Sequence, residues 1–307
     1  MLSCDQIARF NRDGYLVVED VLTDKLPALK AEYADLLDRL CESWGIEGDS
    51  FEDKLIRAYR AGHDWHQPMD ISLPGERIMA DTPFHIGPAV FDFMTAPALL
   101  DVVESLIGPE LVSNPIQHVR IKPPAVDLHG DEIRAHITAT DWHQDRAVGL
   151  EKADQTDMIT AWVAVTDATV ENGCLQVQPF DGPQDILPHC PKQQTAIADA
   201  FINEAGAVPL PVKAGGVVLF HPLVPHSSLV NKTDGIRWSF DLRFNKTGQP
   251  TGRAHFPDFI ARSKAAPDTE MRDWRQYKSM WEEARARLAA QPHIDIHRWQ
   301  SDAPFCA

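Results

Sequence analysis

The chain has 307 residues, of which 44% are hydrophobic, so it can bury a core large enough for one large domain or two small ones. Its formal net charge of −16 works against binding to a polyanion, because contacts to phosphates need clustered Lys and Arg. Nucleic acid and membrane surfaces are therefore not expected as partners. No apolar run approaches ~20 residues, so no transmembrane helix is predicted.

The five cysteines are scattered along the chain and include no C-x-x-C pair. They are Cys4, Cys41, Cys174, Cys190 and Cys306. An odd number without framework spacing predicts reduced thiols in a cytoplasmic protein.

The N-terminal third is predicted to be mainly helical. Residues 4–13 are typical of a short helix, and Gly14 then leads into a β-rich run over residues 15–19. A long helix is expected from Thr23, a candidate N-cap, because leucines and Tyr33 recur at steps of three and four residues. A further helix is predicted over residues 96–107, with Thr95 as its N-cap.

The middle of the chain changes to short β-branched and aromatic runs separated by turn residues. These runs cover residues 112–121, 159–165, 174–178, 216–220 and 236–244. Short strands without intervening helices indicate an antiparallel sandwich or barrel rather than a parallel α/β sheet. Residues 269–289 return to a helical pattern, and no repeat or linker divides the chain, so a single domain is predicted.

One short motif carries ligands suited to a metal ion. His143 and Asp145 are two residues apart, which places an imidazole and a carboxylate on one face of an extended segment. His226 lies 81 residues after Asp145, directly after an apolar run, and residues this far apart can share the mouth of a β-barrel. Two histidines and one carboxylate form the facial triad suited to Fe(II), with three positions left open for 2-oxoglutarate and O2.

Arg237 is a candidate for binding the distal carboxylate of 2-oxoglutarate. It lies eleven residues after His226 on the next predicted strand. The guanidinium of arginine can donate two parallel hydrogen bonds to one carboxylate, which the ammonium of lysine cannot do. The alternative is a surface strand residue paired with a nearby aspartate, an interaction worth only ~0–1 kcal/mol. Likewise, an isolated H-x-D is more often incidental than functional.

An ordered set of motifs resembles the phytanoyl-CoA dioxygenase family. The set comprises residues 142–145 (WHQD), 160–162 (TAW), 171–175 (ENGCL) and 226–237 (HSSLVNKTDGIR). The resemblance extends from about residue 117 to residue 244, and residues 10–22 are similar to the family's entry strand. One departure is residues 179–182 (PFDG), where the family often has a P-G-S-H turn.

The resemblance implies a fold, cofactors and site residues. The fold is mainly β with flanking helices (α+β), around a double-stranded β-helix or jelly-roll core. The implied iron ligands are His143, Asp145 and His226, and the implied cosubstrate-binding residues are Arg237, Ser228, Trp162, His189 and His118. The implied domain spans residues 1–307, with a helical part over about 1–110, the core over about 111–247 and a helical extension over about 248–307.

The resemblance also implies an activity: an Fe(II)- and 2-oxoglutarate-dependent oxygenase that uses O2 to hydroxylate a small organic molecule, releasing succinate and CO2. Desaturation or epoxidation by the same iron chemistry, a non-catalytic jelly-roll protein that binds a metal or ligand, and a metal-dependent hydrolase or isomerase remain alternatives. Halogenation is disfavoured because it needs a small residue where Asp145 stands. A monomer or homodimer is expected. His66 and His136 have no spacing that indicates a role.

Overall fold

The computed structural model describes residues 1–75, 77–132, 134–182, 184–192, 194–291, 296, 298–299 and 303–306. The α-helices are α1 Cys4–Asp13, α2 Leu26–Trp44, α3 Phe51–Arg60, α4 His66–Met69, α5 Pro88–Met94, α6 Pro97–Ile107, α7 Asp145–Val148 and α8 Trp274–Ala289. The strands are β1 Tyr15–Val18, β2 Glu110–Lys122, β3 Met158–Ala164, β4 Leu175–Val177, β5 His189–Pro191, β6 Thr195–Ile197, β7 Val208–Leu210, β8 Val217–Phe220, β9 His226–Ser228, β10 Arg237–Lys246 and β11 Phe259–Ser263.

Two antiparallel sheets build the centre of the molecule. The larger has the strand order β1-β8-β3-β10-β2-β11 and the smaller has the order β7-β4-β9, while β5 and β6 form a separate pair. A second core cluster, which includes Trp162 and Phe220 of the larger sheet and Leu175 and Val177 of the smaller, fills the space between the two sheets. Two antiparallel sheets packed face to face around an interior are the predicted jelly-roll arrangement.

The alternation of residues along β10 determines what each face of the larger sheet contacts. Trp238, Phe240, Leu242 and Phe244 belong to the main hydrophobic core. The residues between them are polar and equally buried: Arg237, Ser239, Asp241, Arg243 and Asn245 are at most 5% exposed. Because successive side chains of a strand point to opposite faces, these polar groups line the interior between the sheets.

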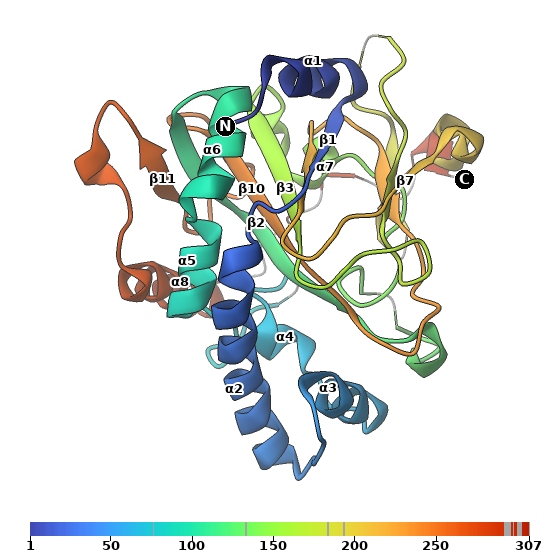
Figure 1. Ribbon diagram of the computed structural model, residues 1–307, viewed down its shortest axis with the longest axis vertical. Helices are drawn as coiled ribbons and strands as arrows, with labels where there is room; N and C mark the ends of the chain where they lie inside the picture. The colour runs from blue at the N-terminus through green and yellow to red at the C-terminus, as the bar shows by residue number, and fades with distance from the viewer. Residues whose placement is uncertain are drawn as a thin grey trace.

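Helices cover the outer face of the larger sheet. In Figure 1, α2, α5, α6 and α8 lie on one side of the sheet, and β7 and the C-terminus lie on the other. Tyr33 of α2 packs edge-on against Trp238 and Phe240 of β10, with ring centroids 5.1 and 5.8 Å apart. The apolar residues whose spacing predicted this helix therefore form the face that contacts the sheet.

Two predicted N-caps are wrong. Thr23 lies in a 3-10 turn, Thr23–Lys25, and α2 begins at Leu26 without a side-chain cap. Thr95 follows α5, where its hydroxyl donates to the carbonyl of Phe91 at 2.7 Å, and α6 begins at Pro97. Both helices carry a proline in their first turn, which lacks an N–H and so leaves one donor fewer to be capped.

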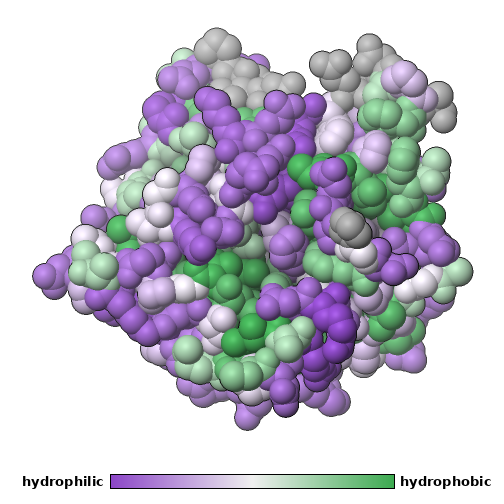
Figure 2. All heavy atoms as spheres, turned by 90° about the horizontal axis from the view of Figure 1, so that it is seen from above, coloured by the Kyte–Doolittle hydropathy of each residue, from purple (hydrophilic) through white to green (hydrophobic). Residues whose placement is uncertain are grey.

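The face of the molecule that is seen from above is mostly hydrophilic (Figure 2). Figure 2 shows hydrophilic residues over much of the face seen from above, with hydrophobic residues gathered around a hollow near its middle. Among the described helices, none is both long enough and apolar enough to cross a membrane.

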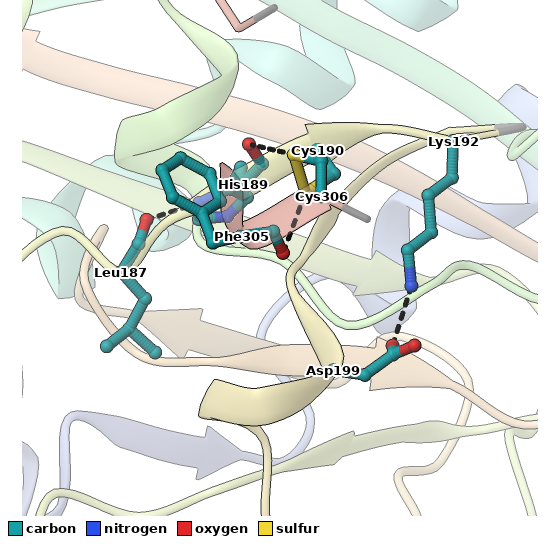
Figure 3. The surroundings of a disulfide bond; sticks show 7 residues. All are labelled: Leu187, His189, Cys190, Lys192, Asp199, Phe305 and Cys306. Carbon is teal, nitrogen blue, oxygen red and sulfur yellow. Dashed lines mark hydrogen bonds and ion pairs between the residues drawn. A yellow bond between two sulfur atoms is a disulfide. The ribbon is translucent and has the colours of Figure 1, made fainter. Parts of the chain in front are cut away.

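The prediction that all cysteines are reduced is wrong for one pair. Cys190 of β5 and Cys306 form a disulfide, while Cys4, Cys41 and Cys174 are free. Figure 3 shows that the bond attaches the C-terminal end to β5 beside His189. The two cysteines are 116 residues apart, so no local spacing could have indicated their pairing.

The disulfide is expected to stabilise the fold. A cross-link that closes a loop this long restricts the unfolded chain, an effect typically worth about 2–4 kcal/mol. Cys306→Ser should lower the free energy of unfolding by this amount in urea titrations without reductant, whereas the exposed Cys4→Ser should not change it. With excess reductant, wild type and Cys306→Ser should unfold at the same urea concentration, and a persisting difference would contradict the assignment.

Candidate active site

His143, Asp145 and His226 meet between the two sheets. His143 and His226 form an isolated antiparallel bridge, with two backbone N–H to O=C bonds of 2.9 Å. Asp145 is the first residue of α7, directly after this extended segment. One ligand atom of each side chain lies within 4.8 Å of the others, and the Nε2 atoms of the histidines are 3.8 and 3.9 Å from Asp145 Oδ1.

Hydrogen bonds to the main chain orient both imidazoles toward Asp145. His143 Nδ1 is 2.8 Å from the carbonyl of Asp141, and His226 Nδ1 is 3.0 Å from the carbonyl of Val224. Since a carbonyl only accepts, each Nδ1 carries the proton and each Nε2 presents a lone pair. Fe(II) in facial-triad sites takes two such nitrogens and one carboxylate on one face of its coordination sphere. These residues therefore fit the ion.

Two further side chains hold the carboxylate of Asp145. The Thr160 hydroxyl donates to Oδ2, and the Arg243 guanidinium donates to Oδ1. Burial alone would raise the pKa of Asp145, but Arg243, the two histidines and the Thr160 hydrogen bond together lower it far below its usual range. Asp145 is therefore ionised, as a metal ligand must be.

Arg237 is buried with one donor group unused. Its Nε donates to the carbonyl of Gly173 at 3.2 Å and its Nη1 to the Ser239 hydroxyl at 2.6 Å. Nη2 has no hydrogen-bond partner among the residues that the structure describes. No carboxylate lies within ion-pair distance among the described residues. The guanidinium carbon is 5.3 Å from the ring centroid of Trp162. Burial lowers the pKa of Arg237, and a bound anion would offset this cost.

The hydrogen bonds that Ser228 accepts leave its hydroxyl proton free to be donated to a ligand. Its Oγ accepts from the backbone N–H of Thr140 at 2.8 Å and from Lys122 Nζ at 2.5 Å. Because a hydroxyl also carries one donor, Ser228 can donate to an acceptor on a ligand. Lys122 pairs with Arg237 across β2 and β10, so a second buried basic side chain lies beside the first, and burial together with Arg237 holds the pKa of Lys122 well below its usual value.

One cavity joins these groups. Its lining consists of Arg120, Thr140, His143, Asp145, Thr160, Trp162, Leu175, Phe220, His226, Ser227, Ser228, Arg237 and Asp241. The structure thus brings together the three predicted metal ligands with Arg237, Ser228 and Trp162. Of the two cations in the lining, Arg120 is neutralised by an ion pair with Asp241.

His189 and His118 lie outside the lining of this cavity. Both ring nitrogens of His189 are engaged: Nε2 accepts from the backbone N–H of Gln144 at 3.1 Å, and Nδ1 is 2.7 Å from the carbonyl of Leu187. His118 Nδ1 is 2.9 Å from Asp70 Oδ2. His189 therefore holds the main chain beside His143, and His118 belongs to a separate group of histidines.

Thr160, Arg243 and Lys122 are among the polar residues of the site that were not predicted from the sequence. Two of them, Thr160 and Arg243, are register partners on β3 and β10, so they flank Asp145 together. The signal that could have indicated Arg243 is the alternation of β10, in which Arg237, Asp241 and Arg243 share one face although the strand is buried. Charged residues on the inner face of a buried strand are costly unless they bind something.

Comparisons with known proteins identify the family of the chain. The family model of phytanoyl-CoA dioxygenase (PhyH) matches residues 10–239. A probable phytanoyl-CoA dioxygenase of Caenorhabditis elegans is 25% identical over 262 residues, which cover 80% of this chain and 75% of the relative.

Two solved structures show the same fold. The non-heme monooxygenase ThoJ, in its apo form, has a TM-score of 0.57 and 22% identity, covering 92% of this chain and 98% of its own. The epimerase SnoN, in complex with Fe3+, alpha ketoglutarate and nogalamycin RO, has a TM-score of 0.51 and 22% identity, covering 81% and 87%. The predicted fold class is confirmed. The chain belongs to the phytanoyl-CoA dioxygenase family, and it is a non-haem iron, 2-oxoglutarate-dependent dioxygenase.

Proposed function

We propose that the protein hydroxylates a small organic molecule, with His143, Asp145 and His226 as iron ligands and Arg237, Ser228 and Trp162 as the cosubstrate site. One observation carries the proposal: a single cavity is lined both by the three ligands and by Arg237, whose Nη2 has no partner. A protein that only bound a metal would have no need of a buried, unneutralised guanidinium next to it.

Each side chain then has a defined task. Bound iron and 2-oxoglutarate supply the oxidising chemistry, with succinate and CO2 as coproducts. Arg237 and Ser228 hold the distal carboxylate by charge and hydrogen bonding, which fixes the cosubstrate relative to the ligands. Leu175 and Phe220 supply apolar walls to the same cavity. A wall without polar groups limits the water around the reacting atoms.

Hydroxylation is the outcome favoured among the oxidations open to such a site. Asp145 fills the ligand position that a halide would need, which argues against halogenation. The names of the C. elegans relative and of ThoJ describe insertion of oxygen. SnoN, however, is named an epimerase, so the fold alone does not fix the product.

Anaerobic titration tests the site. Metal-free protein is titrated with Fe(II) and then with 2-oxoglutarate, while the visible charge-transfer band of the chelated cosubstrate is followed. The band should form in wild type and be absent in His226→Ala. A metal-loaded wild-type protein that gives no band would remove the dioxygenase site and favour a non-catalytic binding protein.

Isotope labelling tests the reaction. Acyl thioesters, amino-acid derivatives and natural products are screened for compounds that accelerate succinate formation, and the product of a positive compound is made under 18O2. Hydroxylation predicts a product with one 18O atom. A product of unchanged mass would indicate epimerisation, and a loss of two hydrogens would indicate desaturation, either of which contradicts the proposal.

Thr160→Val should weaken iron binding. It removes the hydrogen bond that orients Asp145 while keeping the side-chain volume. Loss of a hydrogen bond to a metal ligand typically lowers metal affinity about 10–100-fold. Fe(II) affinity is measured anaerobically against a competing chelator. The control is Thr156→Val, a buried threonine whose hydroxyl donates to the carbonyl of Pro250 away from the cavity. Equal affinity in both variants would show that Thr160 does not orient the ligand.

We also propose a cytoplasmic location, a single domain over residues 1–307 and a monomer or homodimer. Three free thiols, two of them buried, are typical of a reducing compartment, where disulfides are rare. The Cys190–Cys306 disulfide weighs against this location, because a reducing compartment would keep the pair open in the cell. Alkylation of thiols at the moment of lysis, followed by mass spectrometry, reports this, and a fully closed pair would argue for an oxidising compartment.

A further inference from the structure

Three histidines and an aspartate form a second cluster outside the lining of the iron cavity. One ligand atom each from His66, Asp70 and His136 lies within 4.8 Å of the others. The ring centroid of His136 is 4.7 Å from that of His66 and 4.2 Å from that of His118. His66 begins α4, Asp70 follows it, His118 lies on β2 and His136 lies in the turn before His143, so the cluster joins three separate segments.

Two nitrogen atoms of this cluster are buried and have no hydrogen-bond partner in the part of the chain that the structure describes. They are His66 Nε2 and His136 Nδ1. His66 is only 5% exposed. A buried polar atom without a partner costs roughly 1–3 kcal/mol, and such atoms are rare unless an ion or water binds them. Two of them in adjacent imidazoles, beside one carboxylate, indicate a common ligand.

The carboxylate of Asp70 is fixed with one oxygen turned to the histidines. Oδ1 accepts from the backbone N–H groups of Ile71 and Val119, both at 2.8 Å. Among the described residues, the one partner of Oδ2 is His118 Nδ1, at 2.9 Å. Asp70 is 2% exposed, so its orientation is set by these contacts and not by solvent. His118 thus orients the carboxylate, as residues that hydrogen-bond to a metal ligand without contacting the ion commonly do.

We propose that this cluster is a second metal site, which binds Zn2+ or a similar divalent transition ion through His66 Nε2, His136 Nδ1 and Asp70 Oδ2. Neutral imidazoles and a carboxylate are the ligands that Zn2+ takes, with a tetrahedral arrangement and bonds of about 2.0–2.2 Å. The three ligand atoms already lie within 4.8 Å of one another, and binding of the ion draws them closer.

An ion in this position attaches the segment before His143 to α4 and β2. The same segment also contacts the iron cavity, since Arg120, which lines that cavity, donates to the carbonyl of Ala135 at 3.0 Å. The second ion therefore has a structural task that is separate from oxygen activation. It holds the approach to His143 in place, and its loss does not remove any ligand of the iron.

The experiment counts metal ions at the two sites separately. Untagged, metal-free protein is equilibrated with Zn2+ and its bound metal is measured by elemental analysis after gel filtration. Wild type should bind two equivalents, whereas His226→Ala and His136→Gln should each bind one. The double variant His226→Ala/His136→Gln should bind none. Because each site is removed by its own variant, failure of one proposal can be told from failure of the other.

Co2+ gives a second readout, and a matched histidine gives the control. In His226→Ala, Co2+ should produce the strong visible absorption of a tetrahedral site, and adding His136→Gln should abolish it while the far-ultraviolet circular dichroism stays unchanged. His129→Gln, an exposed histidine of the same segment, should leave both absorption and stoichiometry as they were. A His226→Ala protein that binds no Zn2+, or a His136→Gln change that leaves stoichiometry intact, would overturn the second site.

Discussion

Asp145→Ala is expected to abolish iron binding and succinate formation and also to destabilise the metal-free protein by about 3–5 kcal/mol. The second effect comes from Arg243, which is 3% exposed and donates to Asp145 Oδ1. Removing one partner of a buried ion pair leaves the other charge without compensation, and that loss falls in this range. Urea titration of the metal-free variants measures it, and anaerobic Fe(II) titration measures the loss of the ion.

Two further variants separate the roles of Asp145. Asp145→Ala/Arg243→Met removes both charges and should recover much of the lost stability without recovering iron. Asp157→Ala breaks a largely exposed pair with Lys246 and should cost at most about 1 kcal/mol. If Asp145→Ala were as stable as wild type, the charge of Arg243 would be balanced by another group. If it still formed succinate at the wild-type rate, Asp145 would not be a ligand.

The fold and the proximity of His143 to Asp145 could be expected from the sequence because their signals are local, whereas the assignment of His226 rests on the family resemblance. H-x-D places two donors on one extended segment, and short turn-bounded runs indicate antiparallel strands. Arg243 and Thr160 could not be found in this way. Their association with Asp145 depends on the register of β10 against β3, which pairs residues 83 positions apart. Register is set by packing of the whole sheet, which a single segment does not report.

The second cluster has only a weak local signal in the sequence. His66 and Asp70 are four residues apart, a spacing that places two side chains on one side of a helical turn. His118 and His136 come from a strand and a turn far along the chain, so their convergence is a property of the fold alone. The disulfide is the same case, because Cys190 and Cys306 meet only after the C-terminal segment has packed against β5.

Arg237→Ala is expected to raise the dissociation constant of 2-oxoglutarate by roughly 30- to 4,000-fold and to leave Fe(II) affinity unchanged. Truncating one partner of a buried, hydrogen-bonded charge pair costs about 2–5 kcal/mol, and Arg237 is fully buried with one donor free for the ligand. Arg237→Lys keeps the charge but not the planar donor pair, so its effect should be intermediate. Anaerobic titration of the iron-loaded variants measures both constants.

Pyruvate identifies which part of the cosubstrate Arg237 binds. It is a 2-oxo acid without the distal carboxylate, so it can occupy the iron-facing end of the site but cannot reach Arg237. Wild type should prefer 2-oxoglutarate strongly, and Arg237→Ala should lose most of that preference by weakening 2-oxoglutarate alone. Arg262→Ala, which breaks ion pairs to Asp101 and Glu104 on α6, should lower stability and leave the preference intact. An Arg237→Ala protein that still discriminated between the two acids would place the distal carboxylate elsewhere, with Lys122 and Ser228 as the next residues to substitute.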